Sequence, residues 1–497
     1  ETVCLVGESG SGKSVTSLSL MRLVEFGGGE ITNGSLVLER NNKQAKNLVE
    51  ADASTMRSIR GNEVGMIFQE PMTSLNPVFT IERQLTDGLR LHTNLSGRET
   101  REKALQLLKE VRIPDPEKRL RQYPHELSGG MRQRVVIAMA MACRPRLLIA
   151  DEPTTALDVT IQAEILALIN RLKYETGMAV LFITHDMAVV AQMADRVVVM
   201  YRGDMIEEAP VEKIFSEPKE DYTKALLAAV PQLGEMAGTS EPRPLDVPGY
   251  ETLQKNQTKN LTARQETVLE VQNLITRFPV YGGVFRRNVA NVHAVENVSF
   301  SIKKGETMAL VGESGCGKST CGRSILRLVE PLSGKILLNN QNILALNSHE
   351  LRKTRRDMQM IFQDPFASLN PYMTLRDQIA EPLKNFGLVS KSEMEDIICD
   401  MLRKVELPLG FLKRFPHELS GGQRQRVAIA RAIVVNPSLV VADEAVSALD
   451  VSVQAQVLNL MMALQDQLGL SYLFISHDMA VVERVSHKVG VMYLGRL

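Results

Sequence analysis

The chain has 497 residues, 44% of them hydrophobic and 23% charged, and its 58 basic and 58 acidic side chains leave no net charge. This length exceeds what one hydrophobic core serves, so we expect two or more domains. The ordinary globular composition excludes a disordered or fibrous chain, and the balanced charge argues against the basic surface that nucleic acids require.

The cysteines and the apolar runs bear on three features: disulfide bonds, zinc sites and membrane-spanning segments. Its five cysteines are scattered without a CxxC pair, which argues against a disulfide framework or a zinc site. No apolar run reaches the roughly 20 residues of a membrane span, so we expect no transmembrane segment and a membrane role only through a partner. The sequence opens at Glu1 within a predicted strand and stops at "MYLGRL", so we expect further segments beyond both ends.

The sequence contains one unit twice. "VGESGSGKS" from Val6 recurs as "VGESGCGKS" from Val311, and "PHELSGGMRQR" from Pro124 recurs as "PHELSGGQRQR" from Pro416. In both halves, 23 residues separate the serine of "LSGG" from the aspartate of "ADE". Preserved order and spacing predict two domains of the same fold.

Each half is expected to fold as an α/β domain. Apolar runs such as "TVCLVG", "RLLIADE" and "AVLFITHD" alternate with helical patterns, which predicts buried parallel strands with crossover helices. In such sheets ligands bind at the carboxyl ends of the strands, where the motifs fall. The predicted domains span 1–230 and 267–497, and the Pro-, Gly- and Thr-rich segment 231–266 is a predicted linker.

Both halves carry a GxxxxGK[ST] phosphate loop between a predicted strand and a predicted helix. Glycine lets the backbone turn its N–H groups toward phosphate, and the following helix N-terminus adds partial positive charge. We expect Lys13 and Lys318 to reach the β- and γ-phosphates of a bound nucleotide. The predicted loops are Gly7, Glu8, Ser9, Gly10, Ser11, Gly12, Lys13 and Ser14, and Gly312, Glu313, Ser314, Gly315, Cys316, Gly317, Lys318, Ser319 and Thr320.

An acidic pair ends a later strand in each half. Asp151 and Asp443 are predicted to hold Mg²⁺, together with Ser14 and Ser319 of the loops. The neighbouring residues, Glu152 and Glu444, are candidates to polarise the attacking water. One such pair is commonly a solvated turn, but two pairs, each behind a phosphate loop, favour catalysis.

Two further residue types complete the catalytic set. His185 and His477 follow another strand at equivalent positions, which favours contact with the γ-phosphate over a structural role. Gln69 and Gln363, in "IFQ", carry an amide oxygen able to bind Mg²⁺ or water.

A second glycine-rich turn, "LSGG", precedes an apolar helix in each half. Serine is a good N-cap, and unpaired N–H groups follow it, so this helix end can also bind an anion. A capped helix start would explain a single copy. It does not explain why a phosphate loop and an unused anion site occur together twice.

With the phosphate loop, "LSGGMRQR", "ADEP", Asp158 in "ALD" and His185 identified, both halves resemble the nucleotide-binding domains of ATP-binding cassette transporters. The resemblance covers nearly the whole chain except the linker. "EPMTSLNP", "DPFASLNP", "YPHELSGG" and "DYTKALLAAVPQL" are similar to the oligopeptide, dipeptide and nickel importer subfamily. It implies two P-loop domains in tandem, each a RecA-like α/β core with a helical subdomain, at about 70–145 and 365–437.

The resemblance also implies how the halves cooperate. They pair head to tail, with Asp158 and Asp450 at the interface, so that each "LSGG" turn closes over the ATP held by the other half. An aromatic residue stacks on adenine, and in the second half this is Phe278 or Tyr281. The turn over Lys318 is Ser128, Gly129 and Gly130, and the turn over Lys13 is Ser420, Gly421 and Gly422.

The function implied is ATP hydrolysis that energises import of a peptide, glutathione or another di- or oligopeptide, with ATP and Mg²⁺ and two competent sites. The implied partners are two membrane permeases and, through them, a periplasmic solute-binding protein. The chain would lie peripherally on the cytoplasmic face of the bacterial inner membrane. Ala445-Val446 replace Pro153-Thr154 beside Glu444, and we expect activity to survive.

Two alternatives belong to other classes. A soluble tandem cassette ATPase could act on ribosomes or DNA, but the sequence lacks the zinc CxxC pairs and the strongly charged linker expected of such proteins. A non-catalytic, nucleotide-gated scaffold is opposed by the presence of both glutamates and both histidines.

Overall fold

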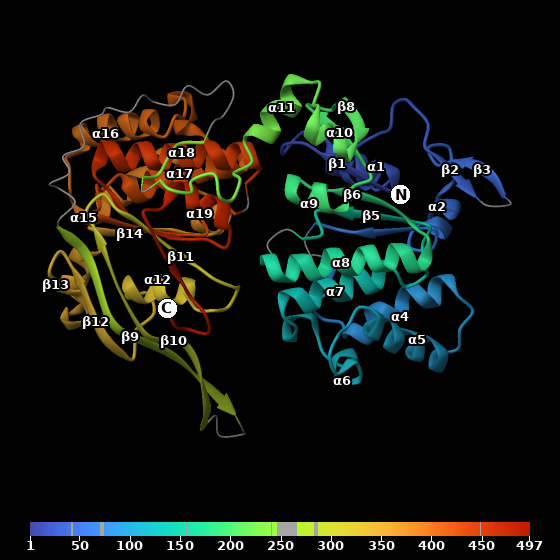
Figure 1. Ribbon diagram of the computed structural model, residues 1–497, viewed down its shortest axis with the longest axis horizontal. Coiled ribbons are helices and arrows are strands. Elements are labelled where there is room, and N and C mark those ends of the chain that lie inside the picture. Colours follow the sequence, from blue (N-terminus) through green and yellow to red (C-terminus); the bar gives the residue numbers. More distant parts are fainter. Residues whose placement is uncertain are drawn as a thin grey trace. The chain divides into compact units, whose positions relative to one another are not determined.

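The computed structural model describes residues 1–40, 43–69, 74–154, 157–239, 241–245, 266–282, 287–447 and 449–497. The chain divides into two compact units, Glu1–Leu227 and Ala228–Leu497 (Figure 1). Each unit contains a parallel sheet with helices and one copy of the repeated motifs, which confirms the predicted α/β fold class.

The first unit is built on a six-stranded sheet of order β4-β5-β6-β1-β7-β8. All neighbours are parallel except β8, which runs antiparallel to β7. The phosphate loop, Gln69, Glu152 and His185 come just after the carboxyl ends of β1, β4, β5 and β6. The strands are β1 (Thr2–Val6), β4 (Val64–Ile67), β5 (Leu147–Asp151), β6 (Ala179–Ile183), β7 (Arg196–Tyr201) and β8 (Asp204–Pro210), with β2 (Val37–Arg40) and β3 (Lys43–Asn47) as a separate antiparallel pair.

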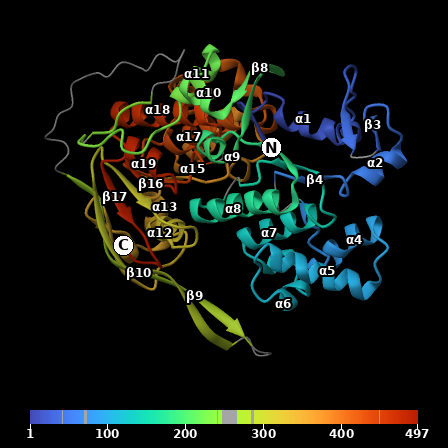
Figure 2. The same cartoon turned by 45° about the vertical axis from the view of Figure 1, so that its right-hand side comes forward.

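Helices pack on this sheet and extend beyond it. Helix α7 contacts the edge strand β4, and α4, α5 and α6 lie together beside α7 (Figure 2). The helices are α1 (Lys13–Leu20), α2 (Ala53–Ile59), α4 (Ile81–His92), α5 (Gly97–Glu110), α6 (Pro116–Leu120), α7 (Gly129–Ala140), α8 (Val159–Thr176), α9 (Met187–Met193), α10 (Val211–Ser216) and α11 (Asp221–Ala228).

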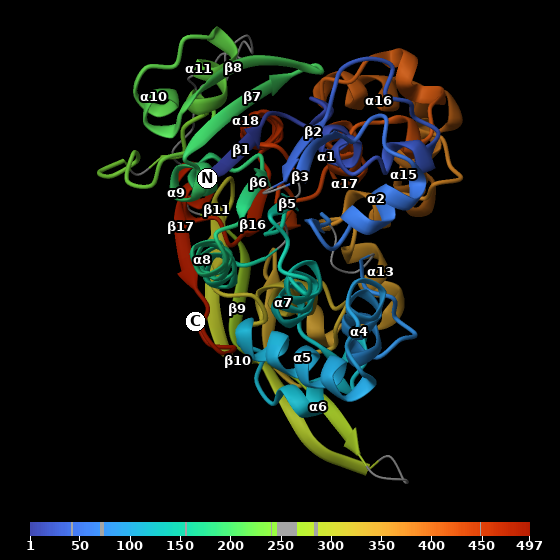
Figure 3. The ribbon, with the colours of Figure 1, turned by 90° about the vertical axis from the view of Figure 1, so that its right-hand side faces the viewer.

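The second unit has a five-stranded parallel sheet of order β14-β15-β16-β11-β17 and a four-stranded antiparallel sheet of order β10-β9-β12-β13. Figure 3 shows β9 and β10 as a long hairpin. The strands are β9 (Thr267–Gly282), β10 (Arg287–Lys303), β11 (Thr307–Val311), β12 (Ser333–Leu338), β13 (Gln341–Asn342), β14 (Met358–Ile361), β15 (Leu439–Asp443), β16 (Ser471–Ile475) and β17 (Lys488–Val491).

The helices of this unit repeat the pattern of the first. Among all described residues of the chain, no helix is long and apolar enough to cross a membrane. The helices are α12 (Lys318–Ile325), α13 (Ser348–Thr354), α14 (Pro365–Ser368), α15 (Leu375–Phe386), α16 (Lys391–Lys404), α17 (Gly421–Ile433), α18 (Val451–Leu468) and α19 (Met479–Val485).

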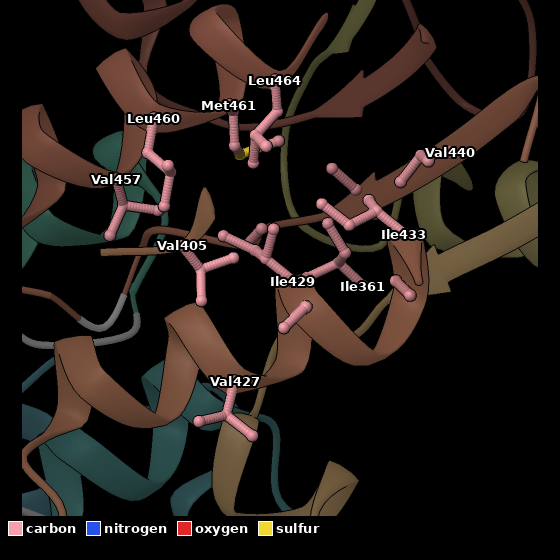
Figure 4. Packing of buried hydrophobic residues seen from close by; sticks show 14 of the residues in the cluster. Ile361, Val405, Val427, Ile429, Ile433, Val440, Val457, Leu460, Met461 and Leu464 are labelled. Atoms are coloured by element: carbon pink, nitrogen blue, oxygen red, sulfur yellow. The ribbon is translucent and has the colours of Figure 1, made fainter. Parts of the chain in front are cut away.

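One apolar cluster fixes the strands and helices that present the site of the second unit. Ile429 and Ile433 of α17 share it with Ile361 of β14 and Val440 of β15, and α18 contributes Leu460 (Figure 4). Full burial of each such side chain contributes about 1.5–3 kcal/mol. The packing therefore sets the relative positions of the chain ends that carry Gln363, Asp443 and the second "LSGG" turn.

The described part of the predicted linker lies on the second unit. The side-chain amide of Asn459 exchanges two hydrogen bonds of 2.8 Å with the backbone N–H and C=O of Leu245. The Leu245 side chain is buried in the same cluster, and Arg484 pairs with Glu235 at 2.9 Å. Residues 246–265 of the predicted linker lie outside the described part of the chain.

Candidate functional site

Each phosphate loop curls around its own lysine. Lys13 Nζ donates hydrogen bonds to the carbonyl oxygens of Gly7 (2.6 Å) and Glu8 (2.8 Å). Lys318 does the same with Gly312 (2.7 Å) and Glu313 (2.9 Å). A Cβ on Gly7 would lie 2.3 Å from the carbonyl oxygen of Met200, so only glycine fits there. Each lysine is the first residue of its helix, which directs the helix N-terminus at the loop.

A serine hydroxyl and an aspartate meet beside each loop. Ser14 Oγ donates to Asp151 Oδ1 at 3.3 Å, and Ser319 Oγ donates to Asp443 Oδ1 at 2.6 Å. Burial raises the pKa of both aspartates. Hydroxyl and carboxylate oxygens are ligands that Mg²⁺ prefers, so each pair fits the predicted metal.

The second oxygen of each aspartate has different neighbours in the two units. Ser17 Oγ donates to Asp151 Oδ2 at 3.0 Å. Gly322 occupies the place of Ser17, and within the described residues Asp443 Oδ2 is buried without a hydrogen bond. The Arg323 guanidinium lies 3.6 Å from that oxygen. The sequence analysis missed Ser17 and Arg323, although each lies about one helical turn beyond a predicted metal ligand.

A glutamine and a histidine flank the glutamate in each unit. Gln69 Nε2 donates to Glu152 Oε2 at 3.0 Å, and His185 Nδ1 lies 3.2 Å from Glu152 Oε1. The second unit repeats this with Gln363 Nε2 to Glu444 Oε2 at 2.7 Å and His477 Nδ1 to Glu444 Oε1 at 3.5 Å. Residues from three separate strand ends are thus brought together twice.

The electrostatics of the second constellation follow from these contacts. The contact with His477 lowers the pKa of Glu444, although burial acts in the opposite direction. The same contact raises the pKa of His477. The glutamate is therefore ionised at neutral pH and can accept a proton from a bound water.

Both glutamates sit in left-handed backbone conformation, which is costly for any residue with a side chain. Their φ angles are 45° for Glu152 and 48° for Glu444. The N–H of each donates to the end of the neighbouring strand, at Ile183 O and Ile475 O, both at 2.9 Å. Such a conformation costs about 1–3 kcal/mol, and both units adopt it at the glutamate.

The "LSGG" turns are capped helix starts whose two glycines differ. Ser128 and Ser420 accept hydrogen bonds from the third N–H of α7 and α17. A Cβ on Gly422 would lie 2.2 Å from Val453 Cγ1 of α18, so this glycine is required by packing. A Cβ on Gly129, the first glycine of the other turn, would meet no atom within 4 Å. Packing within the unit therefore leaves room for a side chain at Gly129.

A further residue of the first signature, missed by the sequence analysis, touches the glutamate region. Gln133 Nε2 of α7 donates to the carbonyl oxygen of Pro153 at 2.5 Å. In the second unit Ala445 replaces Pro153, and the buried Gln425 amide has no hydrogen bond within the described residues. The "QR" after "LSGG" was the available signal, but it did not identify the partner.

The β9–β10 hairpin distinguishes the two aromatic candidates. Thr276 Oγ1 hydrogen-bonds Ser324 of α12, the helix that follows the second phosphate loop, at 2.9 Å. Side chains alternate along a strand, so Phe278 shares the face of Thr276, whereas Tyr281 lies on the other face. Both rings are exposed, Phe278 by 40% and Tyr281 by 63%.

Several known proteins are similar to this chain. The chain matches the ABC transporter family over residues 1–155 and 295–447. It is 54% identical over 500 residues to the glutathione import ATP-binding protein GsiA of Salmonella paratyphi A and to that of Escherichia coli K12, covering 100% of this chain and 80% of each relative. A solved dimeric post-hydrolysis state of the ATP-binding cassette MJ0796 bound to ADP and Pi is 30% identical, with TM-score 0.42, over 46% of this chain and 96% of that one.

Proposed function

Because the chain belongs to the ATP-binding cassette (ABC) transporter family, we propose that it hydrolyses ATP to energise import of a peptide, with glutathione as the cargo. The observation that carries this proposal is the duplicated Gln–Glu–His constellation beside a phosphate loop. Its presence in both units favours two hydrolysis sites over one active and one degenerate site.

The carboxylates of Glu152 and Glu444 orient the attacking water and accept its proton as its oxygen attacks the γ-phosphorus. The bond to the bridging oxygen breaks, and ADP leaves. His185 and His477 hold the γ-phosphate, and the glutamines position water through their amide oxygens. Mg²⁺, held by Ser14, Asp151 and Gln69 or by Ser319, Asp443 and Gln363, would neutralise charge on the β- and γ-phosphates.

Each ATP is bound by residues of both halves in this proposal. Lys13 and the turn of Ser420, Gly421 and Gly422 form one site, and Lys318 and the turn of Ser128, Gly129 and Gly130 form the other. Suppose that the ratio of closed to open halves is 1:99 without ATP and 99:1 with it. ATP must then bind the closed form more tightly than the open form by about 5.5 kcal/mol in total. Charge-assisted hydrogen bonds of about 1.5–3 kcal/mol each, shared between two ATP molecules, supply that amount.

Adenine in the second site stacks on Phe278. This ring shares the strand face that contacts the helix of the phosphate loop, whereas Tyr281 belongs to the opposite face.

The partners are two membrane permeases and, through them, a solute-binding protein, and the chain lies peripherally on the cytoplasmic face of the inner membrane. The names of the relatives, which are import ATP-binding proteins, support this assignment. No nucleic acid is involved, in keeping with the absence of net charge.

Reconstitution tests this function. The chain is combined in liposomes with the permeases of a glutathione importer, and ATP hydrolysis is measured with and without a binding protein loaded with glutathione. We expect glutathione to accelerate hydrolysis and to accumulate inside the liposomes. A hydrolysis rate that does not change when permeases and binding protein are added would favour a soluble tandem ATPase. Stimulation by another peptide, with none by glutathione, would show that this peptide is the cargo.

A further inference from the structure

A side chain from the last helix of the first unit forms a hydrogen bond with the first phosphate loop. Tyr222, in the first turn of α11, accepts a hydrogen bond through its hydroxyl from the backbone N–H of Glu8 over 3.2 Å. Glu8 is the second residue of the loop, more than 200 residues earlier in the sequence. The tyrosine belongs to "DYTKALLAAVPQL", which the mechanism above leaves unused.

The surroundings of Tyr222 fix its position. Its ring packs on Tyr201 at the end of β7, with ring centroids 4.4 Å apart. The carboxylate of Glu207 in β8 accepts hydrogen bonds from the N–H groups of Lys219 (2.9 Å) and Glu220 (3.1 Å), just before α11. Glu207 is only 9% exposed. A buried carboxylate thus anchors the start of α11, and an aromatic contact sets the ring.

Tyr222 and Lys13 hold opposite sides of the same loop residue. Lys13 Nζ binds the carbonyl oxygen of Glu8 at 2.8 Å, while Tyr222 binds its N–H. An ammonium group has three donors, and a phosphate that draws Lys13 forward competes with the loop carbonyls for them. The tyrosine contact does not use the lysine, so it can keep the loop entry in place while Lys13 engages phosphate.

We propose that Tyr222 is a positioning residue for the first ATP site: its hydroxyl holds the entry of the phosphate loop in the curvature that binds phosphate. The inference rests on the proposed ATP site at Lys13. A loop that must be ordered on binding loses affinity, so removing the hydroxyl raises the Kd for ATP at this site about two- to tenfold. The catalytic residues are untouched, so kcat stays constant.

The test uses Y222F, which keeps the stacked ring and removes only the hydroxyl. The full chain is titrated with fluorescent MANT-ATP in a K318A background, so that the first site dominates binding. Y174F is the matched control, because Tyr174 on α8 is 80% exposed. The same Y222F substitution in a K13A background reports the second site, and the midpoint of thermal unfolding reports structural damage.

We expect Y222F to raise the Kd in the K318A background while leaving it unchanged in the K13A background, with Y174F like the parent in both. An unchanged Kd in the K318A background, or an equal rise in both backgrounds, overturns the role of Tyr222. A lowered unfolding midpoint without a change in Kd also overturns it and leaves a structural tyrosine. If K13A itself does not weaken binding, the proposed first ATP site fails instead.

Discussion

Nδ1 of His477 lies 3.5 Å from Oε1 of Glu444, and the two side chains shift each other's pKa in opposite directions. The first unit places His185 against Glu152 in the same way, at 3.2 Å. The Glu444 carboxylate therefore has a neighbour that favours its ionised form, and in both units the imidazole lies beside the carboxylate of the glutamate.

In an E152Q background, where the second site dominates hydrolysis, replacing Glu444 with Gln should lower the hydrolysis rate by about 10²- to 10⁴-fold, the usual contribution of a general base. The amide keeps the shape of the side chain but cannot accept the proton of water. ATP binding, measured by MANT-ATP fluorescence, should remain. E117Q on α6, where Glu117 is exposed, is the control, and turnover equal to that control would refute the assignment.

The Glu444–His477 pair should make stability depend on pH. Because the pKa of Glu444 is lowered, its contribution is present above its ordinary value of about 4.3 and is lost as pH falls through the lowered value. Because the pKa of His477 is raised, its contribution is complete below about 6.5 and is lost as pH rises through the raised value. H477Q should therefore lower the thermal unfolding midpoint more at pH 6 than at pH 9.

The same pair can be observed directly by NMR of histidine-labelled protein. The resonance that disappears in H477Q should titrate above pH 6.5 in the parent and closer to 6.5 in E444Q. A His477 titration that does not move in E444Q would show that the carboxylate does not control this imidazole.

The two glycines of the second signature should respond differently to alanine. G422A forces a Cβ to within 2.2 Å of Val453 Cγ1, and overpacking of this kind costs about 1–3 kcal/mol. The nearest atom to a Cβ on Gly421 is 3.7 Å away, so G421A should leave the unfolding midpoint nearly unchanged while reducing ATP hydrolysis. Equal destabilisation by both substitutions, with unchanged hydrolysis in G421A, would assign both glycines to packing.

Asn459 should hold the segment that precedes the second sheet. N459A leaves the N–H and C=O of Leu245 without their buried partner, at about 1–3 kcal/mol for an unpaired group. Amide hydrogen exchange in the peptide containing Leu245 should accelerate about tenfold or more. N385A, at an exposed position on α15, is the control, and exchange in N459A no faster than in N385A would contradict the anchor.

Alanine substitutions of Phe278 and Tyr281 should have different effects on the nucleotide affinity of the second site. Stacking on a base contributes about 1–3 kcal/mol, so F278A should raise the Kd of the second site roughly 5- to 150-fold. Y281A, on the opposite strand face, should not change it. MANT-ATP titration in a K13A background checks this. If Y281A raised the Kd and F278A did not, Tyr281 would be the residue that stacks on adenine.

The sequence predicted the repeat, the fold class and the residues that meet at each strand end, because those signals are local. A strand followed by GxxxxGK[ST] determines the position of Lys13, and alternating strands and helices determine the sheet. Contacts between distant segments were not predictable in this way. Tyr222 reaches Glu8 only because β8 and α11 fold back on β7, and Leu245 meets Asn459 only after α18 has packed.

The sequence also hid differences between the halves that look minor in the motifs. Ser17 and Gly322 occupy equivalent positions in the two halves. Ser17 donates a hydrogen bond to Asp151, whereas Gly322 has no side chain and the neighbour of Asp443 is Arg323 instead. The choice between Phe278 and Tyr281 likewise needed the strand register, since both are exposed aromatic residues and lie three positions apart on one strand.

Vanadate trapping with photoreactive 8-azido-ATP tests most directly whether both units hydrolyse ATP. The nucleotide is trapped only after turnover, and labelled peptides are then assigned to the first or the second unit by mass spectrometry. Two competent Gln–Glu–His constellations predict vanadate-dependent label in both units. Label confined to one unit would contradict the account.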